Sequence, residues 1–167
     1  MQLEACIVDI TTLAADAIVN AANPELAPGG GVCGAIHRAA GPELARACAD
    51  LGPCPTGEAR LTPGFRLPAR HVIHAVGPVW QGGSQGEGGL LASAYSSVLR
   101  IAGEHGLRWI ALPAISTGIY GFPLGLATEI AIRTVRAEGP KAGLQRITVA
   151  CFSPEVLAAY RAAGVPA

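Results

Sequence analysis

The segment from Val19 to Gly41, VNAANPELAPGGGVCGAIHRAAG, holds the residues whose types and spacing point most clearly to chemistry. Three consecutive glycines, Gly29 to Gly31, lie between an apolar run and a helical pattern that begins near Val32. Consecutive glycines let the backbone turn several N–H groups into one concavity, and a helix start adds unpaired donors and a partial positive charge. The spacing therefore predicts an anion-binding loop. The alternative is that these glycines serve only a turn and a helix start.

A second loop of similar character follows the apolar run Trp109 to Pro113 and reads AISTGIYGFP before a helical pattern near Pro123. Two such loops at strand ends suit a ligand with two adjacent phosphates lying across the edge of a sheet. Tyr120 lies inside this polar loop rather than on an apolar face, which favours contact with a sugar or a base. The alternative is an ordinary, partly exposed tyrosine.

The charged residues exclude several other functions. The chain has 167 residues with 12 Lys plus Arg and 12 Asp plus Glu, so no net field favours nucleic acid or an anionic membrane. The single lysine is Lys141, so neither glycine loop carries a phosphate-binding lysine. Gly29, Gly31 and Gly34 also fit G-x-G-x-x-G, but no acidic residue closes a second strand about twenty residues later. A Rossmann oxidoreductase is therefore a weaker hypothesis.

Glycine and proline separate short apolar runs from amphipathic segments, a pattern typical of alternating strands and helices. The apolar runs predict strands over Leu3–Ile10, Ala17–Ala22, His71–Val76, Trp109–Pro113 and Ile147–Phe152. The amphipathic segments predict helices over Val32–Ala40, Glu43–Leu51, Leu90–His105, Leu124–Glu138 and Pro154–Ala163. The first two strands are joined too closely for a long crossover, so we expect an α/β fold with a mixed sheet and helices on both faces.

The length suits one domain over residues 1–167, and no linker or repeat divides it. We expect a cytoplasmic protein, because the first residues lack a signal-peptide pattern and no apolar run approaches a membrane span. The five cysteines are odd in number and lack C-x-x-C spacing, so we expect reduced thiols and no metal site. His71, His74 and His105 are interpreted as structural, since two flank a buried strand and one ends a helix.

Taken together, the motifs resemble the macro domain family of ADP-ribose-binding modules. The resemblance rests on VDIT at Val8–Thr11, on VNAANPELAPGGGVCGAIHRAAG, on HAVGPVW at His74–Trp80 and on PAISTGIYGFP at Pro113–Pro123, in this order and spacing. It covers the chain from about Gln2 to Tyr160. It implies a three-layer α/β/α sandwich with a mixed sheet of about six strands, with ADP-ribose in a cleft above the sheet and no cofactor.

The resemblance assigns a role to each end of the ligand. Asp9 matches the aspartate that accepts a hydrogen bond from the adenine amino group, and Ile10 matches its neighbour whose backbone helps to hold the ring. Phe152 matches the residue that packs on adenine. For Asp9 the alternative is a cap on the turn at Thr11, and for Phe152 it is simple core packing. Asn23 matches the asparagine that binds the distal ribose, with Asn20 beside it as support.

The two phosphate loops follow from the same comparison. The first loop is assigned Gly30, Gly31, Val32, Cys33 and Gly34, and the second is assigned Ser116, Thr117, Gly118, Ile119 and Tyr120. Within the second loop, Tyr120 is the aromatic residue beside the distal ribose. The expected partners are ADP-ribose or O-acetyl-ADP-ribose, and mono-ADP-ribosylated proteins.

Cys33 is the departure from this resemblance. The branch of the family that the chain most resembles hydrolyses O-acetyl-ADP-ribose and the esters that join ADP-ribose to acidic side chains, and its motif has aspartate where this chain has Cys33. In that branch the carboxylate orients or activates a water, with help from the diphosphate. A thiol is a poorer partner for water. Hydrolysis through Asn23 and the diphosphate, a non-catalytic ADP-ribose-binding module, and a nucleophilic Cys33 beside His37 therefore all stay open.

Overall fold

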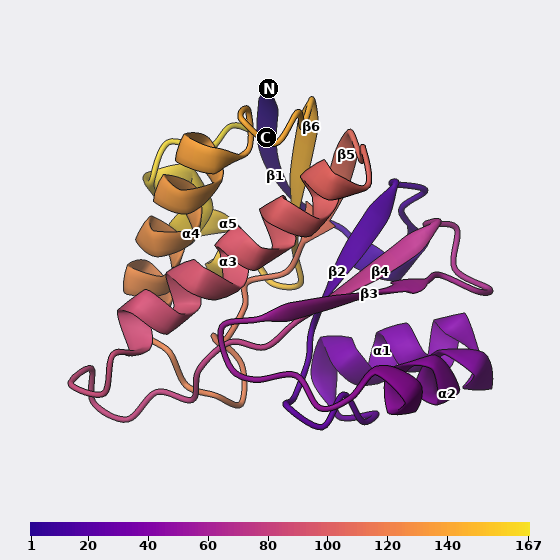
Figure 1. The fold of residues 1–167 in the computed structure, drawn as a ribbon. Helices are drawn as coiled ribbons and strands as arrows, with labels where there is room; N and C mark the ends of the chain where they lie inside the picture. Colours follow the sequence, from indigo (N-terminus) through magenta and orange to yellow (C-terminus); the bar gives the residue numbers. More distant parts are fainter.

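A six-stranded sheet forms the centre of the computed structural model, which describes residues 1–167 (Figure 1). Its strands are β1 (Gln2–Ile7), β2 (Ala17–Ala21), β3 (Ala59–Pro63), β4 (His71–Ala75), β5 (Trp109–Leu112) and β6 (Arg146–Cys151), in the spatial order β1-β6-β5-β2-β4-β3. All neighbouring strands are parallel except β3 and β4, which are antiparallel. The predicted mixed α/β sheet is therefore confirmed.

The reason given for a mixed sheet was wrong, because β1 and β2 neither pair nor run antiparallel. Residues 8–16 lead from the end of β1 back to the start of β2 and contain only the 3-10 helix η1 (Ile10–Thr12). Nine extended residues reach about 30 Å, which is enough for this return without a long crossover helix. The antiparallel pair comes instead from β3, an edge strand that the sequence did not reveal. Its ARLTP sequence is short, carries Arg60 and ends in Pro63, and thus lacks the apolar run of a central strand.

Helices cover both faces of the sheet, as expected. On one face lie α1 (Gly31–Ala40) and α2 (Pro42–Leu51); on the other lie α3 (Glu87–Glu104), α4 (Leu124–Glu138) and α5 (Pro154–Ala162) (Figure 1). Gly41, at φ 89°, separates α1 from α2, and Pro42 occupies the first turn of α2, where its missing N–H is not needed. None of the helices has the length and hydrophobicity of a membrane-spanning segment.

Helix α3 begins three residues before the predicted Leu90, because Glu87 closes the loop that precedes it. The Glu87 carboxylate accepts hydrogen bonds from the backbone N–H groups of Gln81, Gly83 and Gln85 at 2.6 to 2.9 Å. Burial alone would raise the pKa of Glu87, but these donations outweigh it and lower the pKa to about 2. The negative charge also lies in the first turn of α3, where the helix dipole favours it.

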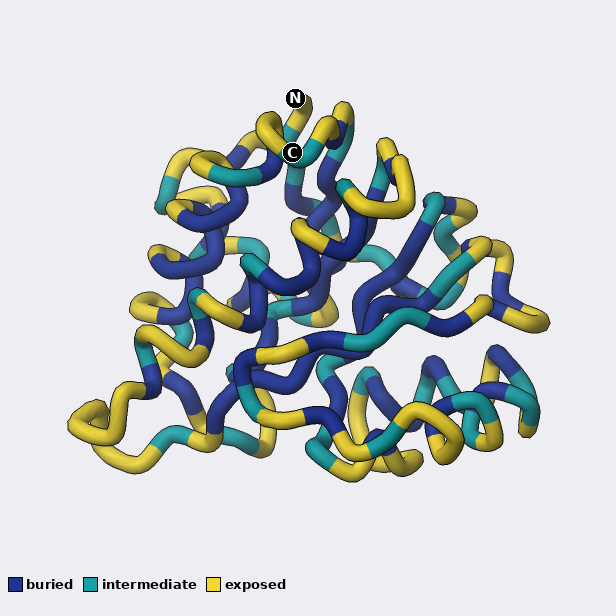
Figure 2. The backbone as a smooth tube through the Cα atoms, viewed as in Figure 1, coloured by how far each residue is buried: buried dark blue, intermediate teal, exposed yellow.

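Two apolar clusters hold the layers together. A cluster of 29 buried residues lies between the sheet and α3, α4 and α5, and a smaller one of 15 lies between the sheet and α1 and α2. Figure 2 shows the buried backbone running through the sheet and the inner sides of the helices. The chain termini lie close together, and Ala5 donates its backbone N–H to Pro166 at 2.8 Å.

Candidate functional site

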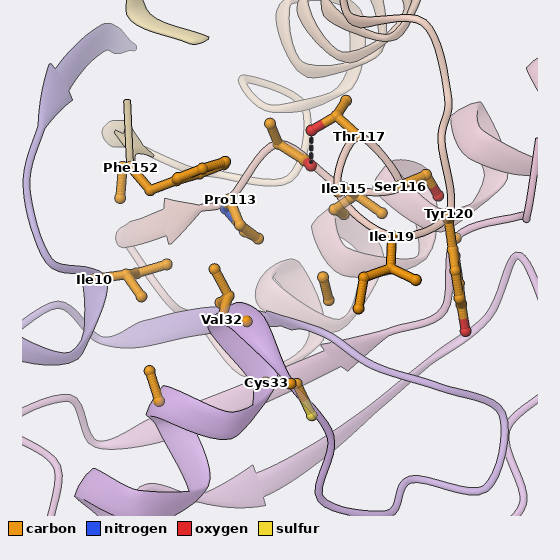
Figure 3. Close-up of a pocket in the computed structure, with 18 of the residues that line it drawn as sticks. Ile10, Val32, Cys33, Pro113, Ile115, Ser116, Thr117, Ile119, Tyr120 and Phe152 are labelled. Atoms are coloured by element: carbon orange, nitrogen blue, oxygen red, sulfur yellow. Dashed lines mark hydrogen bonds between the residues drawn. The ribbon is translucent and has the colours of Figure 1, made fainter. Parts of the chain in front are cut away.

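A pocket of about 840 Å³ opens at the carboxyl ends of the parallel strands, the usual ligand position in an open α/β sheet. It is formed by the ends of β1, β2, β5 and β6 together with the start of α1. In Figure 3, Ile10 and Phe152 lie at one end and Tyr120 at the other, while Val32 and Cys33 lie across the cavity from Ile119 and the second glycine loop. Its volume lies within the range typical of small-molecule sites.

The first loop presents unpartnered donors to this pocket. Helix α1 has Gly30 as its N-cap, without a side-chain cap, and no backbone or side-chain acceptor takes the N–H groups of Gly31, Val32 and Cys33. Gly31 has φ 57°, a left-handed conformation in which a side chain would be strained. The predicted anion-binding geometry is therefore present in the backbone.

The second loop faces the first and also leaves its donors free. The N–H groups of Gly118, Ile119 and Tyr120 have no protein acceptor, and the loop is closed by Phe122 N–H donating to Ser116 O at 2.9 Å. Ser116 has φ 68°, and its buried Oγ has no partner. A left-handed serine with an unpartnered hydroxyl is strained and costly, and such residues concentrate at ligand sites.

The electrostatics of the pocket come from the backbone rather than from cationic side chains. No lysine, arginine or histidine lines it, and Asp9 is its single charged lining residue. An anion between the two loops would therefore be held by N–H groups and by the positive end of the α1 dipole. No group of three or more His, Cys, Asp or Glu residues in the structure is arranged to hold a metal ion.

At the Asp9 end of the pocket, the aspartate caps a turn and also lines the cavity. Oδ1 of Asp9 accepts hydrogen bonds from Thr11 N–H at 3.0 Å and from Thr11 Oγ1 at 2.7 Å, so it caps the turn. Oδ2 has no hydrogen-bond partner. Asp9 lines the pocket, as does Ile10, whose N–H is also free. Phe152 is 69% exposed and therefore not a core residue. This end offers an acceptor, a donor and an aromatic face.

At the opposite end, Asn23 and Cys33 meet at the backbone of Ala27. Oδ1 of Asn23 accepts from Ala27 N–H, and its Nδ2 donates to Ala27 O, both at 2.9 Å. Each of these atoms keeps one hydrogen-bonding direction for a ligand. Cys33 is 6% exposed, and its Sγ donates to the same Ala27 carbonyl at 3.7 Å. Tyr120 also lines this end, and burial, then the nearby Glu25 and Cys33, raises the pKa of its hydroxyl.

Two of the predicted residues do not line the pocket. Asn20 is 1% exposed and lies behind Cys33, with its Nδ2 at 3.7 Å from Sγ, so its support is indirect. Gly34 packs against the first loop, and a Cβ there would lie 2.5 Å from the carbonyl oxygen of Gly29. His37 makes no hydrogen bond to Cys33, and neither of its ring nitrogens has a partner. A nucleophilic Cys33 would therefore lack the base that the sequence offered for it.

Other lining residues were not predicted from the sequence. Ala21, Ala22, Ala150 and Cys151 contribute from strand ends, and Gly77 contributes from the loop after β4. A side chain on Gly77 would collide with Ser116 and Ile115, so glycine is needed for the second loop to pack there. The glycine in HAVGPVW was the available signal, while the alanines and Cys151 resemble ordinary core residues of a buried strand.

The fold is thus a six-stranded sheet between two layers of helices, with two glycine loops at the carboxyl ends of its strands whose backbone N–H groups have no protein acceptor. The Macro domain family model matches residues 19–131, and a macro domain-containing protein of Ralstonia nicotianae is 59% identical over 161 residues, 96% of this chain and 93% of that protein. The chain belongs to the macro domain family.

Two further relatives bear on the pocket. A Klebsiella pneumoniae protein named O-acetyl-ADP-ribose deacetylase is 52% identical over 166 residues, 96% of this chain and 95% of its own length. The crystal structure of a Trypanosoma brucei macrodomain in complex with ADP-ribose is 43% identical, with a TM-score of 0.90, and the alignment covers 95% of this chain and 67% of that one.

Proposed function

We propose that the protein binds ADP-ribose in this pocket and hydrolyses the ester of O-acetyl-ADP-ribose or the ester that joins ADP-ribose to an acidic side chain. The observation that carries the binding proposal is the pair of facing loops whose N–H groups have no protein acceptor. A diphosphate between them would accept from both sets of donors. The T. brucei macrodomain, solved with ADP-ribose, supports this ligand.

The chemistry of the two ends sets the orientation of the ligand. The free Asp9 Oδ2 and the free Ile10 N–H form an acceptor and donor pair that suits the adenine amino group and a ring nitrogen, with Phe152 beside the ring. The remaining hydrogen-bonding directions of Asn23 suit the hydroxyls of the distal ribose, next to Tyr120. An ester on that ribose would then lie near Cys33 and the diphosphate.

Hydrolysis would use a water held between the distal ribose and the diphosphate. The water attacks the ester carbonyl carbon while a diphosphate oxygen takes its proton. The ester C–O bond then breaks, the diphosphate returns this proton to the leaving ribose oxygen, and the acyl group leaves as the carboxylic acid. Asn23 positions the ribose, and the loop N–H groups hold the diphosphate in place. Cys33 contributes no carboxylate, so the rate depends on positioning and on the diphosphate. The O-acetyl-ADP-ribose deacetylase named in K. pneumoniae supports this class of reaction.

A non-catalytic ADP-ribose-binding module is the second candidate, and Cys33 favours it. Its thiol donates to Ala27 and accepts from Asn20, so both of its hydrogen-bonding roles are directed into the protein. Binding needs only the backbone loops and the two ends of the pocket, all of which are present whether or not water is activated.

Calorimetry with free ADP-ribose tests binding. We expect micromolar affinity or better, with only a gentle loss as salt rises, because no cationic side chain lines the pocket. The variant Asp9→Asn keeps the side-chain shape, and we expect it to lose about tenfold or more in affinity, since a charged hydrogen bond to the amine is removed. No binding at millimolar ADP-ribose would overturn the proposal.

Single-turnover hydrolysis of O-acetyl-ADP-ribose separates the enzyme from the binding module. With diphosphate-assisted water, Cys33→Ala retains most of the parental rate, Asn23→Ala loses most of it, and Cys33→Asp gains about 10²- to 10⁴-fold if the carboxylate fits. Calorimetry on each variant shows whether the pocket is intact, because Asn23 also closes the turn to Ala27.

The same four proteins exclude the other mechanisms. No parental turnover with undiminished ADP-ribose binding indicates the non-catalytic module. Complete loss in Cys33→Ala, together with inactivation by iodoacetamide that ADP-ribose prevents, would indicate a nucleophilic cysteine and contradict the water mechanism. A glutamate-linked mono-ADP-ribosylated protein, assayed in parallel, tests the second substrate class.

A further inference from the structure

A row of buried polar side chains runs from the edge of the sheet to the floor of the pocket. Oγ1 of Thr62 on β3 lies 3.0 Å from Nε2 of His74 on β4, and Nδ1 of His74 lies 3.1 Å from Nδ2 of Asn20 on β2. The same Nδ2 lies 3.7 Å from Sγ of Cys33 at the start of α1. His74 and Asn20 are 0% and 1% exposed, so solvent does not compete for these contacts.

The row continues to Asn23 through the backbone of Ala27. Cys33 donates to the Ala27 carbonyl, and Asn23 holds both the carbonyl and the N–H of the same residue. Cys33 therefore contacts the turn from Asn23 to Ala27. Asn20 in turn contacts Cys33, and His74 contacts Asn20. Asn23 is the residue assigned to the distal ribose.

The directions of these hydrogen bonds are consistent along the row. Burial, reinforced by the charge of nearby His37, lowers the pKa of His74 to about 3, so the ring is neutral and has one donor and one acceptor nitrogen. With the amide of Asn20 oriented as observed, its two protons serve Nδ1 of His74 and Sγ of Cys33, and Nε2 of His74 donates to Thr62. Oδ1 of Asn20 has no partner. Nothing besides His74 and Cys33 therefore fixes the orientation of this amide.

Strand register creates the row. Asn20 and His74 are register partners in the parallel β2–β4 pair, and both side chains point towards α1 and α2. One alternation back along the same strands, the pair on this face is Ile18 and Val72, which packs without any polar cost. The polar pair appears only where the strands reach the pocket, at the level of Cys33.

We propose that His74 is a positioning residue for the distal-ribose end of the pocket, acting through Asn20, Cys33 and the Asn23–Ala27 turn. This inference rests on the proposed function, since it takes the Asn23 end of the pocket to hold the distal ribose. It implies that His74 affects recognition of the distal ribose more than recognition of the rest of the ligand, although it touches neither.

Binding of ADP and ADP-ribose to the same variants tests this, because ADP lacks the distal ribose. The measured quantity is the ratio of the two dissociation constants by calorimetry. In His74→Leu, which removes both ring nitrogens, we expect the preference for ADP-ribose to fall about threefold to tenfold, with ADP affinity within about twofold of the parent. His74→Asn places an amide oxygen near the position of Nδ1 and should restore part of the preference.

Two threonine variants complete the design. Thr62→Val removes the hydroxyl at 3.0 Å from Nε2 but leaves Sγ of Cys48 at 3.6 Å, so it should reduce the preference for ADP-ribose less than His74→Leu does. It also decides the question if His74→Leu does not fold. Thr134→Val is the matched control, because Thr134 is similarly buried but bonds only to Ile130 within α4. If the role of His74 were only structural, His74→Leu, Thr62→Val and Thr134→Val would all lower stability. The ratio of the dissociation constants for ADP and ADP-ribose would then be unchanged in all three variants.

The outcomes are distinguishable. If the parent does not prefer ADP-ribose over ADP, the proposed ligand assignment fails. If the parent does prefer ADP-ribose and both His74→Leu and Thr62→Val retain that preference in full, the positioning role of His74 is overturned while the proposed function stands.

Discussion

The two helical layers bury different kinds of side chain against the same sheet. Under α3, α4 and α5 the sheet side chains are apolar or, in Cys151, a thiol, and the cluster contains 29 buried residues. Under α1 and α2 the cluster contains 15, and Asn20, Thr62 and His74 are buried beside it. The pocket loops meet both layers. The larger layer reaches the second loop through one buried hydroxyl, that of Tyr95, which accepts from Ile115 N–H at 3.2 Å, whereas the smaller layer carries the row from Thr62 through His74 and Asn20 to Cys33.

The two layers contribute differently, one mainly to the stability of the fold and the other to the orientation of side chains at the pocket. Apolar burial is non-directional and scales with area, so the larger layer can supply most of the stability without fixing any angle. Hydrogen bonds are directional, so a buried polar row fixes side-chain orientation, and leaving one of its members without a partner is costly. The smaller layer can therefore position Cys33 and Asn23 while the larger one holds the fold.

The largest expected effect is on stability, from a cavity in the larger layer. Leu91→Ala removes a fully buried side chain of α3 and should lower the free energy of unfolding by about 2–5 kcal/mol. ADP-ribose affinity of the folded protein should change by less than about twofold. Urea denaturation and calorimetry measure the two quantities, and Leu126→Ala, at an exposed site on α4, is the control. A large loss of affinity would contradict the separation of tasks.

A second prediction concerns the pH dependence that His74 gives to the smaller layer. Its pKa is about 3 in the folded protein against 6.5 ordinarily, so between these values the unfolded chain binds more protons. Stability should therefore fall as pH drops below 6.5, by about 1.4 kcal/mol per pH unit. In His74→Asn the profile between pH 6.5 and 4.5 should be flatter, apart from the contribution of His37, whose pKa burial also lowers. An unchanged slope would contradict this assignment.

A third prediction concerns the larger layer, in which Glu87 makes stability depend on pH over a separate, more acidic range. The pKa of Glu87 is about 2 in the folded protein against 4.5 ordinarily, so its contribution is present above pH 4.5 and is lost as pH falls towards 2. Glu87→Gln should be less stable at neutral pH and lose less on acidification over this window, with Glu4 and Asp16 providing the remaining slope. Chemical denaturation at pH 7 and pH 3 measures the free energy of unfolding of the parent and of Glu87→Gln.

The smallest effect tests how closely α1 approaches the first loop. Gly34→Ala would place a Cβ 2.5 Å from Gly29 O, so the loop must shift, and ADP-ribose affinity should fall about tenfold. Gly125→Ala on α4 is the matched control, because no atom lies within 4 Å of its added Cβ. Equal affinities for the two variants would show that the first loop tolerates displacement.

The sequence by itself determined the features that depend on neighbours along the chain. The two glycine loops, the helix starts that follow them and most strand positions were predictable, because turn chemistry and apolar periodicity act over a few residues. Asp9, Asn23 and the second loop are found in the pocket because they lie at strand ends, and the carboxyl ends of parallel strands meet at one edge. Even the strain at Ser116 falls within the segment that the sequence assigned to phosphate.

The tertiary structure alone decided which distant residues became neighbours. His74 looked like an ordinary core histidine, and Asn20 like support for Asn23, because the two residues lie 54 positions apart and the sequence carries no sign of their contact. The pairing of β2 with β4, and of β4 with the unrecognised edge strand β3, brings Asn20, His74 and Thr62 onto one face. Such pairing depends on the burial of whole strands between two helical layers, a cooperative and non-local free energy that no short stretch of sequence encodes.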